Sequence, residues 1–343
     1  MIKVIAKPNL GLSDRLPIPG AEDIAFSRNG KTEYMYVAIA GRNAVEVFLR
    51  ATEKAPCEKV EAKQTTQSGV SGKNYALVVG INEYNEWPSL RTPANDAADV
   101  TDELSKFYGF EVKELPGRKC GNKNCKLTKN ELISAIREYA VDQQEPSKTR
   151  VYGDEDQLLI YISGHGALDQ PLDRGYLVTS DSKLYDTNHI SQESQYDLRD
   201  ILNKIPIKHI FVVIDACYAG SFEPTFGQAK FKGETPDEYT RMSLDELRTR
   251  SYHIVTRQFL TSGGADEEVP EGYKRNSPFA EAFLSALRTY GGADHYLTIA
   301  KIKPSFATLQ SNARQGFFGD DDGHGEFFFV YVPLPRSQVP AAD

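Results

Sequence analysis

Apolar and polar positions alternate along most of the chain in a way that predicts a layered fold. Continuous apolar runs at Tyr75–Gly80, Gln157–Ile162 and His209–Ile214 are typical of strands buried on both faces. Between the first two runs, Pro93–Tyr108 carries its apolar residues at helical spacing. Strands that alternate with helices predict an α/β fold with a mostly parallel sheet between helical layers.

Weaker patterns complete the expected order of elements. A capping box formed by Thr128 and Glu131 marks the start of one helix. The remaining patterns predict short strands at Phe110–Val112 and Gln258–Thr261, helices over Leu127–Ala140, Tyr196–Lys204, Pro278–Tyr290 and Ile299–Arg314, and a final strand over Glu326–Val332.

The first part of the chain has a different character. Two strand-like runs, Glu33–Ala40 and Ala44–Arg50, flank a short turn and predict a hairpin. A polar stretch ending at Lys73 is typical of a linker. We therefore predict a small β-rich extension over residues 1–72 and a main domain over residues 73–335. The extension is a candidate inhibitory prosegment, a docking unit or an added strand pair.

Composition limits the cellular compartment and the classes of binding partner that we expect. The 343 residues are 40% hydrophobic and 26% charged, with a net charge of −8. Such acidity makes nucleic acid a poor partner. Four cysteines are too few for a disulfide scaffold. Neither a secretory leader nor a membrane-length apolar stretch is visible. These observations predict a cytoplasmic protein that binds neither nucleic acid nor a membrane.

Two of the buried strands end in residues that can carry chemistry. The strand Gln157–Ile162 runs into Ser163-Gly164-His165-Gly166, and the strand His209–Ile214 runs into Asp215-Ala216-Cys217. The carboxyl ends of neighbouring parallel strands meet at one sheet edge, where sites form. There His165 could act as the base for a Cys217 nucleophile. The N–H groups of Gly166 and Cys217 could form an oxyanion hole.

Each of these two residues also has a structural interpretation. A cysteine after an apolar strand is often an inert core thiol, and a histidine at a strand end is often a polar cap. The pair is more informative, because a histidine about 50 residues before the cysteine is the spacing of a known class of cysteine peptidases. The joint pattern therefore favours catalysis.

At these residues the chain resembles the caspase and metacaspase family of cysteine peptidases, clan CD, family C14, and especially bacterial caspase homologues. The resemblance spans about Asn74 to Val332 and rests on YALVVGINEY, NDAADV, YISGHG, VVIDACYAGSF, FLTSGGADE and NSPFAEAFLSAL. It implies the caspase–hemoglobinase fold, a three-layer sandwich around a mainly parallel six-stranded sheet. It also implies a large-subunit-like part (73–222), an activation loop (223–253) and a small-subunit-like part (254–335).

The residues that match the metacaspase pocket imply cleavage after arginine or lysine. Asp215 stands where caspases have glutamine, and Asp96 and Ser163 match the other residues of an acidic primary (S1) pocket. Carboxylates attract a guanidinium or ammonium and repel a substrate aspartate. Structurally, Asp96 could instead cap a helix and Asp215 could be an anchor. Arg91 aligns one residue away from the position at which caspases have a pocket arginine, and we interpret it as outside the pocket.

Regulation by self-cleavage is a further implication of the resemblance. Family members are often zymogens that are cut in the loop after the nucleophile, and an upstream activator or regulatory partner is a related expectation. Basic residues in this loop match the expected specificity, although a solvated loop with scattered charges is an equal alternative. The candidate self-cleavage sites are Lys230, Lys232, Arg241, Arg248 and Arg250.

Metal sites are not supported by the sequence. Asp173 resembles one calcium ligand of some metacaspases, but Pro224 replaces another, and calcium needs six to eight oxygens. Cys120 and Cys125 form at most half of a zinc site. The run Asp320–Gly323 is interpreted as a charged turn. We expect no metal and no cofactor, and we treat calcium dependence as unsupported.

Two other functions stay open at this point. One is a catalytically silent caspase-like scaffold or sensor. The other is a peptidase of the legumain or gingipain type with a different residue preference. The presence of Cys217, His165 and both candidate pocket carboxylates favours a regulated cysteine endopeptidase that cuts protein substrates after arginine or lysine.

Overall fold

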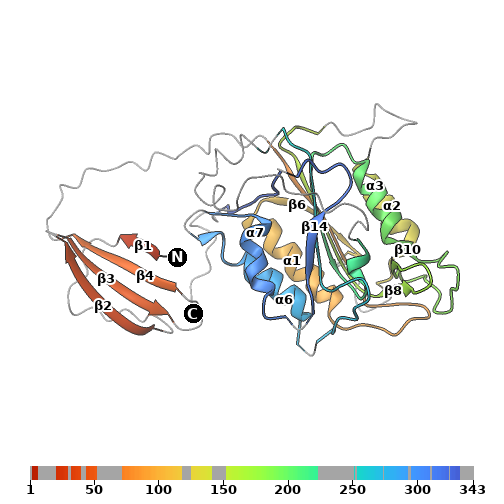
Figure 1. The fold of residues 1–343 in the computed structure, drawn as a ribbon, viewed down its shortest axis with the longest axis horizontal. Helices are drawn as coiled ribbons and strands as arrows, with labels where there is room; N and C mark the ends of the chain where they lie inside the picture. Colours follow the sequence, from red (N-terminus) through yellow and green to blue (C-terminus); the bar gives the residue numbers. More distant parts are fainter. Residues whose placement is uncertain are drawn as a thin grey trace. The chain divides into compact units, whose positions relative to one another are not determined.

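The chain forms two compact units, Met1–Gly69 and Val70–Asp343, which are described separately. The structure is a computed structural model (Figure 1). It describes residues 72–117, 125–140, 152–222, 251, 253–272, 274–292, 295–309, 311–323 and 325–332, and the backbone of four strands nearer the N-terminus.

The first unit contains a four-stranded sheet in the order β1-β4-β3-β2. Its antiparallel hairpin β3–β4 corresponds to the two predicted strands. The first two strands were not predicted, because their apolar and polar residues alternate only weakly. The bounds are β1 Ile2–Ala6, β2 Ala21–Asn29, β3 Thr32–Ile39 and β4 Ala44–Ala51.

The second unit is built on a six-stranded sheet in the order β14-β12-β11-β7-β5-β6, which confirms the predicted α/β fold class. Every neighbouring pair in it is parallel except β12–β14. The bounds are β5 Asn74–Gly80, β6 Phe110–Leu115, β7 Gln157–Ser163, β11 His209–Asp215, β12 Thr256–Thr261 and β14 Arg314–Phe317.

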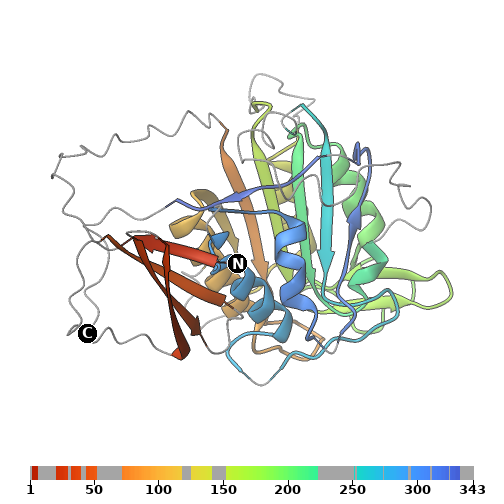
Figure 2. The ribbon, with the colours of Figure 1, turned by 60° about the vertical axis from the view of Figure 1, so that its left-hand side comes forward.

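Helices cover both faces of this sheet and complete the three layers (Figure 2). Helices α1 (Pro93–Phe107, orange), α6 (Pro278–Leu287) and α7 (Ile299–Ile302, both blue) lie on one face. Helices α2 (Lys129–Arg137) and α3 (Gln195–Asn203, green) lie on the other. The predicted capping box at the start of α2 is present.

Alternation along the buried strands explains why two cores form. Leu158 and Ile160 of β7 pack in the core that includes α2 and α3, whereas Leu159 and Tyr161 pack in the core that includes α1 and α6. Successive side chains of a strand point to opposite faces, so a strand covered by helices on both sides is apolar throughout.

Two predictions about the C-terminal third were wrong. The predicted helix Ile299–Arg314 consists only of α7 and the short 3₁₀ helix η5 (Lys303–Phe306), and Arg314 instead begins the sheet strand β14. The predicted strand over Glu326–Val332 is reduced to β15 (Phe329–Val330), which pairs with β13 (Tyr296–Leu297) outside the main sheet. The apolar run arises because Phe327 and Phe329 fill the core beside α1 and α6.

A small antiparallel sheet follows β7 and was not predicted. Its strands are β8 (Gly166–Asp169), β9 (Arg174–Leu177) and β10 (Glu193–Ser194), in the order β10-β9-β8. Strands of two to four residues are too short to show a pattern of their own. None of the helices in the described part of the chain has the length and apolar character that a bilayer span needs.

Candidate active site

The two candidate catalytic residues follow neighbouring strands at the same level of the sheet. Strands β7 and β11 pair in parallel, with Ser163 opposite Asp215. The Gly164 N–H donates to the Asp215 carbonyl at 3.1 Å and extends this contact past the strand ends. His165 and Cys217 each lie two residues beyond the paired Ser163 and Asp215, so the fold brings them to one edge.

Gly166 is required for this close approach. A Cβ atom at this position would lie 1.9 Å from the carbonyl oxygen of Cys217. Any other residue would therefore push the histidine segment away from the nucleophile segment. The same contact places the Gly166 backbone beside Cys217, where a donor to a developing oxyanion is needed.

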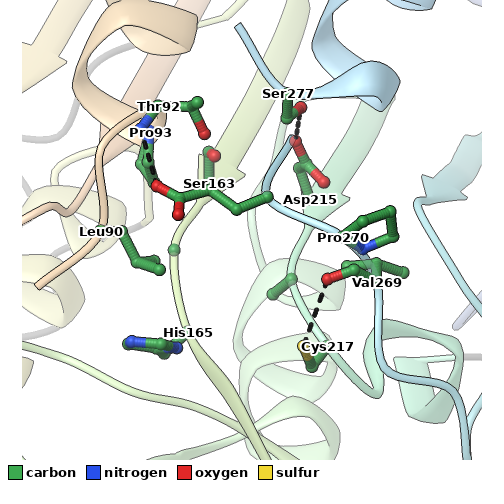
Figure 3. Close-up of a pocket in the computed structure, with 13 residues that line it drawn as sticks. Leu90, Thr92, Pro93, Ser163, His165, Asp215, Cys217, Val269, Pro270 and Ser277 are labelled. Carbon is green, nitrogen blue, oxygen red and sulfur yellow. Dashed lines mark hydrogen bonds between the residues drawn. The ribbon is translucent and has the colours of Figure 1, made fainter. Parts of the chain in front are cut away.

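One cavity of about 120 Å³ connects the catalytic candidates with an acidic region. In Figure 3, His165 and Cys217 lie at one end of the cavity, and Asp215 and Ser277 lie toward the other. The lining residues are Leu90, Thr92, Pro93, Ser163, Gly164, His165, Asp215, Ala216, Cys217, Val269, Pro270, Glu271 and Ser277.

The surroundings of His165 determine which ring nitrogen can act as a base. Nε2 lies 2.9 Å from the carbonyl oxygen of Pro88, and a carbonyl can only accept a hydrogen bond. Nε2 therefore carries the proton and Nδ1 is left as the basic nitrogen. Burial lowers the pKa of His165, so the neutral form is favoured.

Two aromatic residues hold the imidazole in place. The Tyr84 hydroxyl accepts from the backbone N–H of His165 at 3.0 Å and donates to the Ile81 carbonyl at 2.9 Å. The rings of Tyr84 and Trp87 lie with centroids 4.8 Å and 5.4 Å from the imidazole. These contacts restrict rotation of the imidazole.

The Cys217 side chain rests against the segment that follows β12. Its Sγ donates to the Val269 carbonyl at 3.9 Å, and the next residue, Tyr218, has a left-handed backbone with φ of 59°. Tyr218 binds this segment by two hydrogen bonds. Its backbone N–H donates to the Glu267 carbonyl, and its hydroxyl donates to the Glu268 carboxylate. Burial raises the pKa of the Cys217 thiol, so the resting pair is a neutral thiol and a neutral imidazole.

Ser277 joins the two candidate pocket carboxylates. Its N–H donates to Asp96 Oδ1 at 3.0 Å, and its hydroxyl donates to Asp215 Oδ2. The same hydroxyl accepts from the Ala280 N–H at 2.9 Å, so Ser277 is also the N-cap of α6. The helix start and the acidic pair are therefore positioned by one residue.

The two carboxylates differ in their access to the cavity. Asp215 lines it and is 7% exposed, whereas Asp96 is fully buried behind Ser277 and Ser163, whose hydroxyl donates to Asp96 Oδ2 at 3.3 Å. Burial, with the charge of Asp215, raises the pKa of Asp96 to about 7. Burial also raises the pKa of Asp215 to about 6.

Comparison of the sequence with protein families assigns the chain to one of them. A family model described as the caspase domain, of peptidase family C14, matches residues 73–307, which is more than half of the chain. The chain belongs to the caspase family. The caspase-family match includes every residue that lines the cavity.

Curated relatives of this caspase-family chain are metacaspases. Metacaspase-1 of Eremothecium gossypii is 29% identical over 296 residues, which cover 72% of this chain and 62% of that protein. Metacaspase-1 of Schizosaccharomyces pombe is 24% identical over 165 residues, covering 46% of this chain and 36% of that protein. The chain thus spans less than two thirds of the length of either relative.

Among solved structures, the crystal structure of caspase-1 from Spodoptera frugiperda is similar to this chain. The sequence identity is 16% and the TM-score is 0.42, over 76% of this chain and 86% of that chain.

The contacts that several residues make in the candidate site were not predicted from the sequence. Tyr84 and Ser277 fall in motifs that carry the resemblance, but local patterns show only a loop tyrosine and a helix cap. The Pro88 carbonyl and Glu271 left no sequence signal, because their roles depend on contacts across the fold. Arg91 lies outside the residues that line the cavity, and its Nη2 donates to the Gly272 carbonyl at 3.1 Å.

Other expectations about sites cannot be compared with the structure. All five candidate self-cleavage sites, Cys120 and Pro224 lie outside the described residues. Within the described ranges, no three His, Cys, Asp or Glu side chains are grouped in a way that could hold a metal ion. Independence from calcium stays a prediction.

Replacing Asp96 with asparagine is expected to stabilise the protein above pH 7. A carboxyl whose folded pKa is above its unfolded value loses stability as pH rises, because the unfolded chain releases the proton first. For Asp96 this window runs from 3.8 to about 7. The gain from an uncharged asparagine is at most about 4 kcal/mol in the free energy of unfolding. Denaturant unfolding at pH 5 and pH 8 measures it.

Asp99, on the same helix, provides a control of opposite sign. Its pKa is lowered, mainly by hydrogen bonds from Arg275, which lies 2.7 Å from the carboxylate. Its charged form is therefore stabilised in the fold, and Asp99→Asn is expected to lower stability near neutral pH. Equal effects of the two substitutions at pH 8 would contradict this account of Asp96.

Proposed function

We propose that this chain is a cysteine endopeptidase that cleaves proteins after arginine or lysine. The observation that carries the proposal is the cavity that joins His165 and Cys217 to the buried Asp215. Membership of the caspase family supports a cysteine peptidase in general, and the acidic end of the cavity supports the basic preference.

The residues support a nucleophilic mechanism. His165 Nδ1 takes the thiol proton as the Cys217 sulfur attacks the substrate carbonyl, and the oxyanion forms beside the N–H groups of Gly166 and Cys217. The protonated imidazole then gives its proton to the leaving amine, and the C–N bond breaks. Water, activated by the same imidazole, hydrolyses the thioester and restores the thiol.

The specificity rests on charge in a poorly solvated pocket. A substrate guanidinium or ammonium favours the ionised forms of Asp215 and Asp96, whose negative charge is disfavoured by burial in the free protein. A substrate aspartate would add a further negative charge to the same cavity and would be repelled. The expected order of preference therefore places basic residues far ahead of acidic ones.

A panel of fluorogenic peptides tests the proposal. The peptides differ only in the residue before the cut, which is arginine, lysine, asparagine or aspartate, and Cys217→Ala provides the control. Cleavage after arginine and lysine that disappears in Cys217→Ala is the expected result. Preference for aspartate would overturn the specificity, preference for asparagine would favour a legumain-like enzyme, and no cleavage would favour a silent scaffold.

The dependence of kcat/KM on pH is expected to report the pocket carboxylates. For an arginine peptide, kcat/KM should rise as pH increases through about 6 to 7, where Asp215 and Asp96 ionise. Burial lowers the pKa of His165, which moves the deprotonation of the base toward lower pH than for an ordinary imidazole. A peptide with citrulline, the uncharged analogue of arginine, should lose this rise. Identical profiles for the two peptides would contradict the assignment.

Activation by self-cleavage is part of the same proposal. Cuts after Lys230, Lys232, Arg241, Arg248 or Arg250 would divide the chain between its large-subunit-like and small-subunit-like parts, and residues 1–72 are a candidate prosegment. Intact-mass analysis of wild-type and Cys217→Ala protein, purified in parallel, measures the cuts. Loop fragments in the wild type alone are expected, and the same fragments in both proteins would refute self-processing.

Apart from the hydrolytic water, the proposed reaction uses only side chains and backbone of this chain. We therefore expect kcat/KM to be unchanged by EDTA or by added calcium. A calcium-dependent increase in kcat/KM would contradict this expectation and would show that the protein has a calcium site.

A further inference from the structure

Glu271 is a third carboxylate at the cavity and was not among the predicted pocket residues. It follows Val269 and Pro270 on the wall formed after β12, and its side chain is 25% exposed. Asp215 is 7% exposed and Asp96 is fully buried. Of the three carboxylates, Glu271 is therefore the one most accessible to a ligand that enters the cavity.

The Glu271 carboxylate reaches across to the segment that leads into α1. Its Oε1 accepts from the N–H groups of Arg91 and Thr92, the second at 3.1 Å. Thr92 is the N-cap of α1, so Glu271 binds the backbone at the start of this helix. These bonds hold the carboxylate at a defined place between two segments that line the cavity.

The second oxygen of Glu271 is available for exchange. Oε2 lies 3.5 Å from Nε of Arg91, whose side chain is 65% exposed. An ion pair this exposed contributes little to stability, because water screens it. A substrate cation that enters the less solvated cavity can therefore replace Arg91 as the partner of Oε2.

The charge of Glu271 also acts on the catalytic end of the site. Burial lowers the pKa of His165, and the negative charge of Glu271 opposes this effect. Glu271 is thus close enough to the imidazole to influence it, while it lines the same cavity as Asp215.

We propose that Glu271 is the second carboxylate to contact the basic side chain of the substrate and that it sets a preference for arginine over lysine. The inference rests on the proposed function. A guanidinium is a planar fork of five N–H donors and can bind carboxylates on two sides, whereas an ammonium is a compact, strongly hydrated charge. Asp215 and Glu271 supply carboxylates from two different segments of the lining.

Two variants separate substrate binding from a purely structural role. Glu271→Gln keeps an oxygen that can accept from the N–H groups of Arg91 and Thr92 but removes the charge. Arg91→Gln removes the competing cation. If Glu271 only anchors Arg91, both variants lose the same interaction and should behave alike. If Glu271 binds substrate, only Glu271→Gln should weaken the binding of arginine.

The test measures binding in the Cys217→Ala protein by calorimetry, with Nα-acetyl-arginine amide and Nα-acetyl-lysine amide as probes. Glu271→Gln is expected to lower the arginine-to-lysine affinity ratio by about tenfold or more, the effect of a lost charged hydrogen bond. Arg91→Gln should keep the ratio and bind both amides at least as tightly. Thermal unfolding of each variant checks that the fold is intact.

An unchanged ratio in Glu271→Gln, equal losses in both variants, or no binding of either amide would overturn the role of Glu271. The peptide panel, run in parallel, separates this outcome from failure of the proposed function. Cleavage after basic residues with an unchanged arginine-to-lysine ratio would leave the peptidase proposal standing and remove only Glu271 from it.

Discussion

Replacing His165 with alanine is expected to lower kcat/KM for an arginine peptide by about 10²–10⁴-fold, the range for loss of a general base. The effect should be large because burial raises the pKa of the Cys217 thiol, so that little thiolate exists near neutral pH without a base. Initial rates at pH 7.5 measure the loss. Part of the lost rate should return as pH rises and the thiol ionises by itself.

The control for this experiment is His253→Ala. Its side chain is 78% exposed and lies 3.4 Å from the Asp154 carboxylate, and it is not among the residues that line the cavity. Its removal should leave kcat/KM within about twofold, as for most surface substitutions. A similar loss in both variants, or normal activity in His165→Ala, would contradict the assignment of the base.

Replacing Asp215 with asparagine is expected to lower kcat/KM for arginine and lysine peptides by about 30- to 1000-fold. Loss of one partner of a buried, hydrogen-bonded charge pair costs about 2–4 kcal/mol. Asparagine keeps an oxygen that can accept from the Ser277 hydroxyl, so the start of α6 should stay in place. Steady-state kinetics with both peptides measure the effect.

Two comparisons make the result specific to the pocket. Asp99→Asn removes a carboxylate from the α1 surface, where it pairs with Arg275, and should change kcat/KM little. Alkylation of Cys217 by iodoacetamide, an uncharged reagent, should stay within about threefold in Asp215→Asn, because an alkyl group needs no acidic pocket. If alkylation fell as much as peptide cleavage, the role of Asp215 would be structural.

The central strands of the fold were predictable because their burial on both faces is visible in each strand's own sequence. Strands β5, β7 and β11 are buried on both faces, so each is a continuous apolar run. The edge strand β14 has no buried residue, and therefore its sequence, RQGF, shows no apolar pattern. Phe327 and Phe329 misled in the opposite direction, because this apolar run fills a core beside the main sheet and is not a strand of it.

The candidate site was predictable only in part for a related reason. His165 and Cys217 are visible because each directly follows an apolar strand and matches a family motif. Ser277, the Pro88 carbonyl and Glu271 act through contacts between segments far apart in the chain, such as the contact from Ser277 to Asp96. Such contacts depend on how α1, α6 and the segment after β12 pack around the cavity, which no local pattern encodes.

Affinity labelling with a peptidyl arginine chloromethyl ketone tests the central claim most directly, because fast labelling by this reagent requires an acidic pocket, a nucleophile and a base in one cleft. Intact-mass analysis and peptide mapping should find one adduct, on Cys217, that forms much faster than with the matched aspartyl reagent and slows in both His165→Ala and Asp215→Asn. An adduct mainly on another residue, or faster labelling by the aspartyl reagent, would contradict the account.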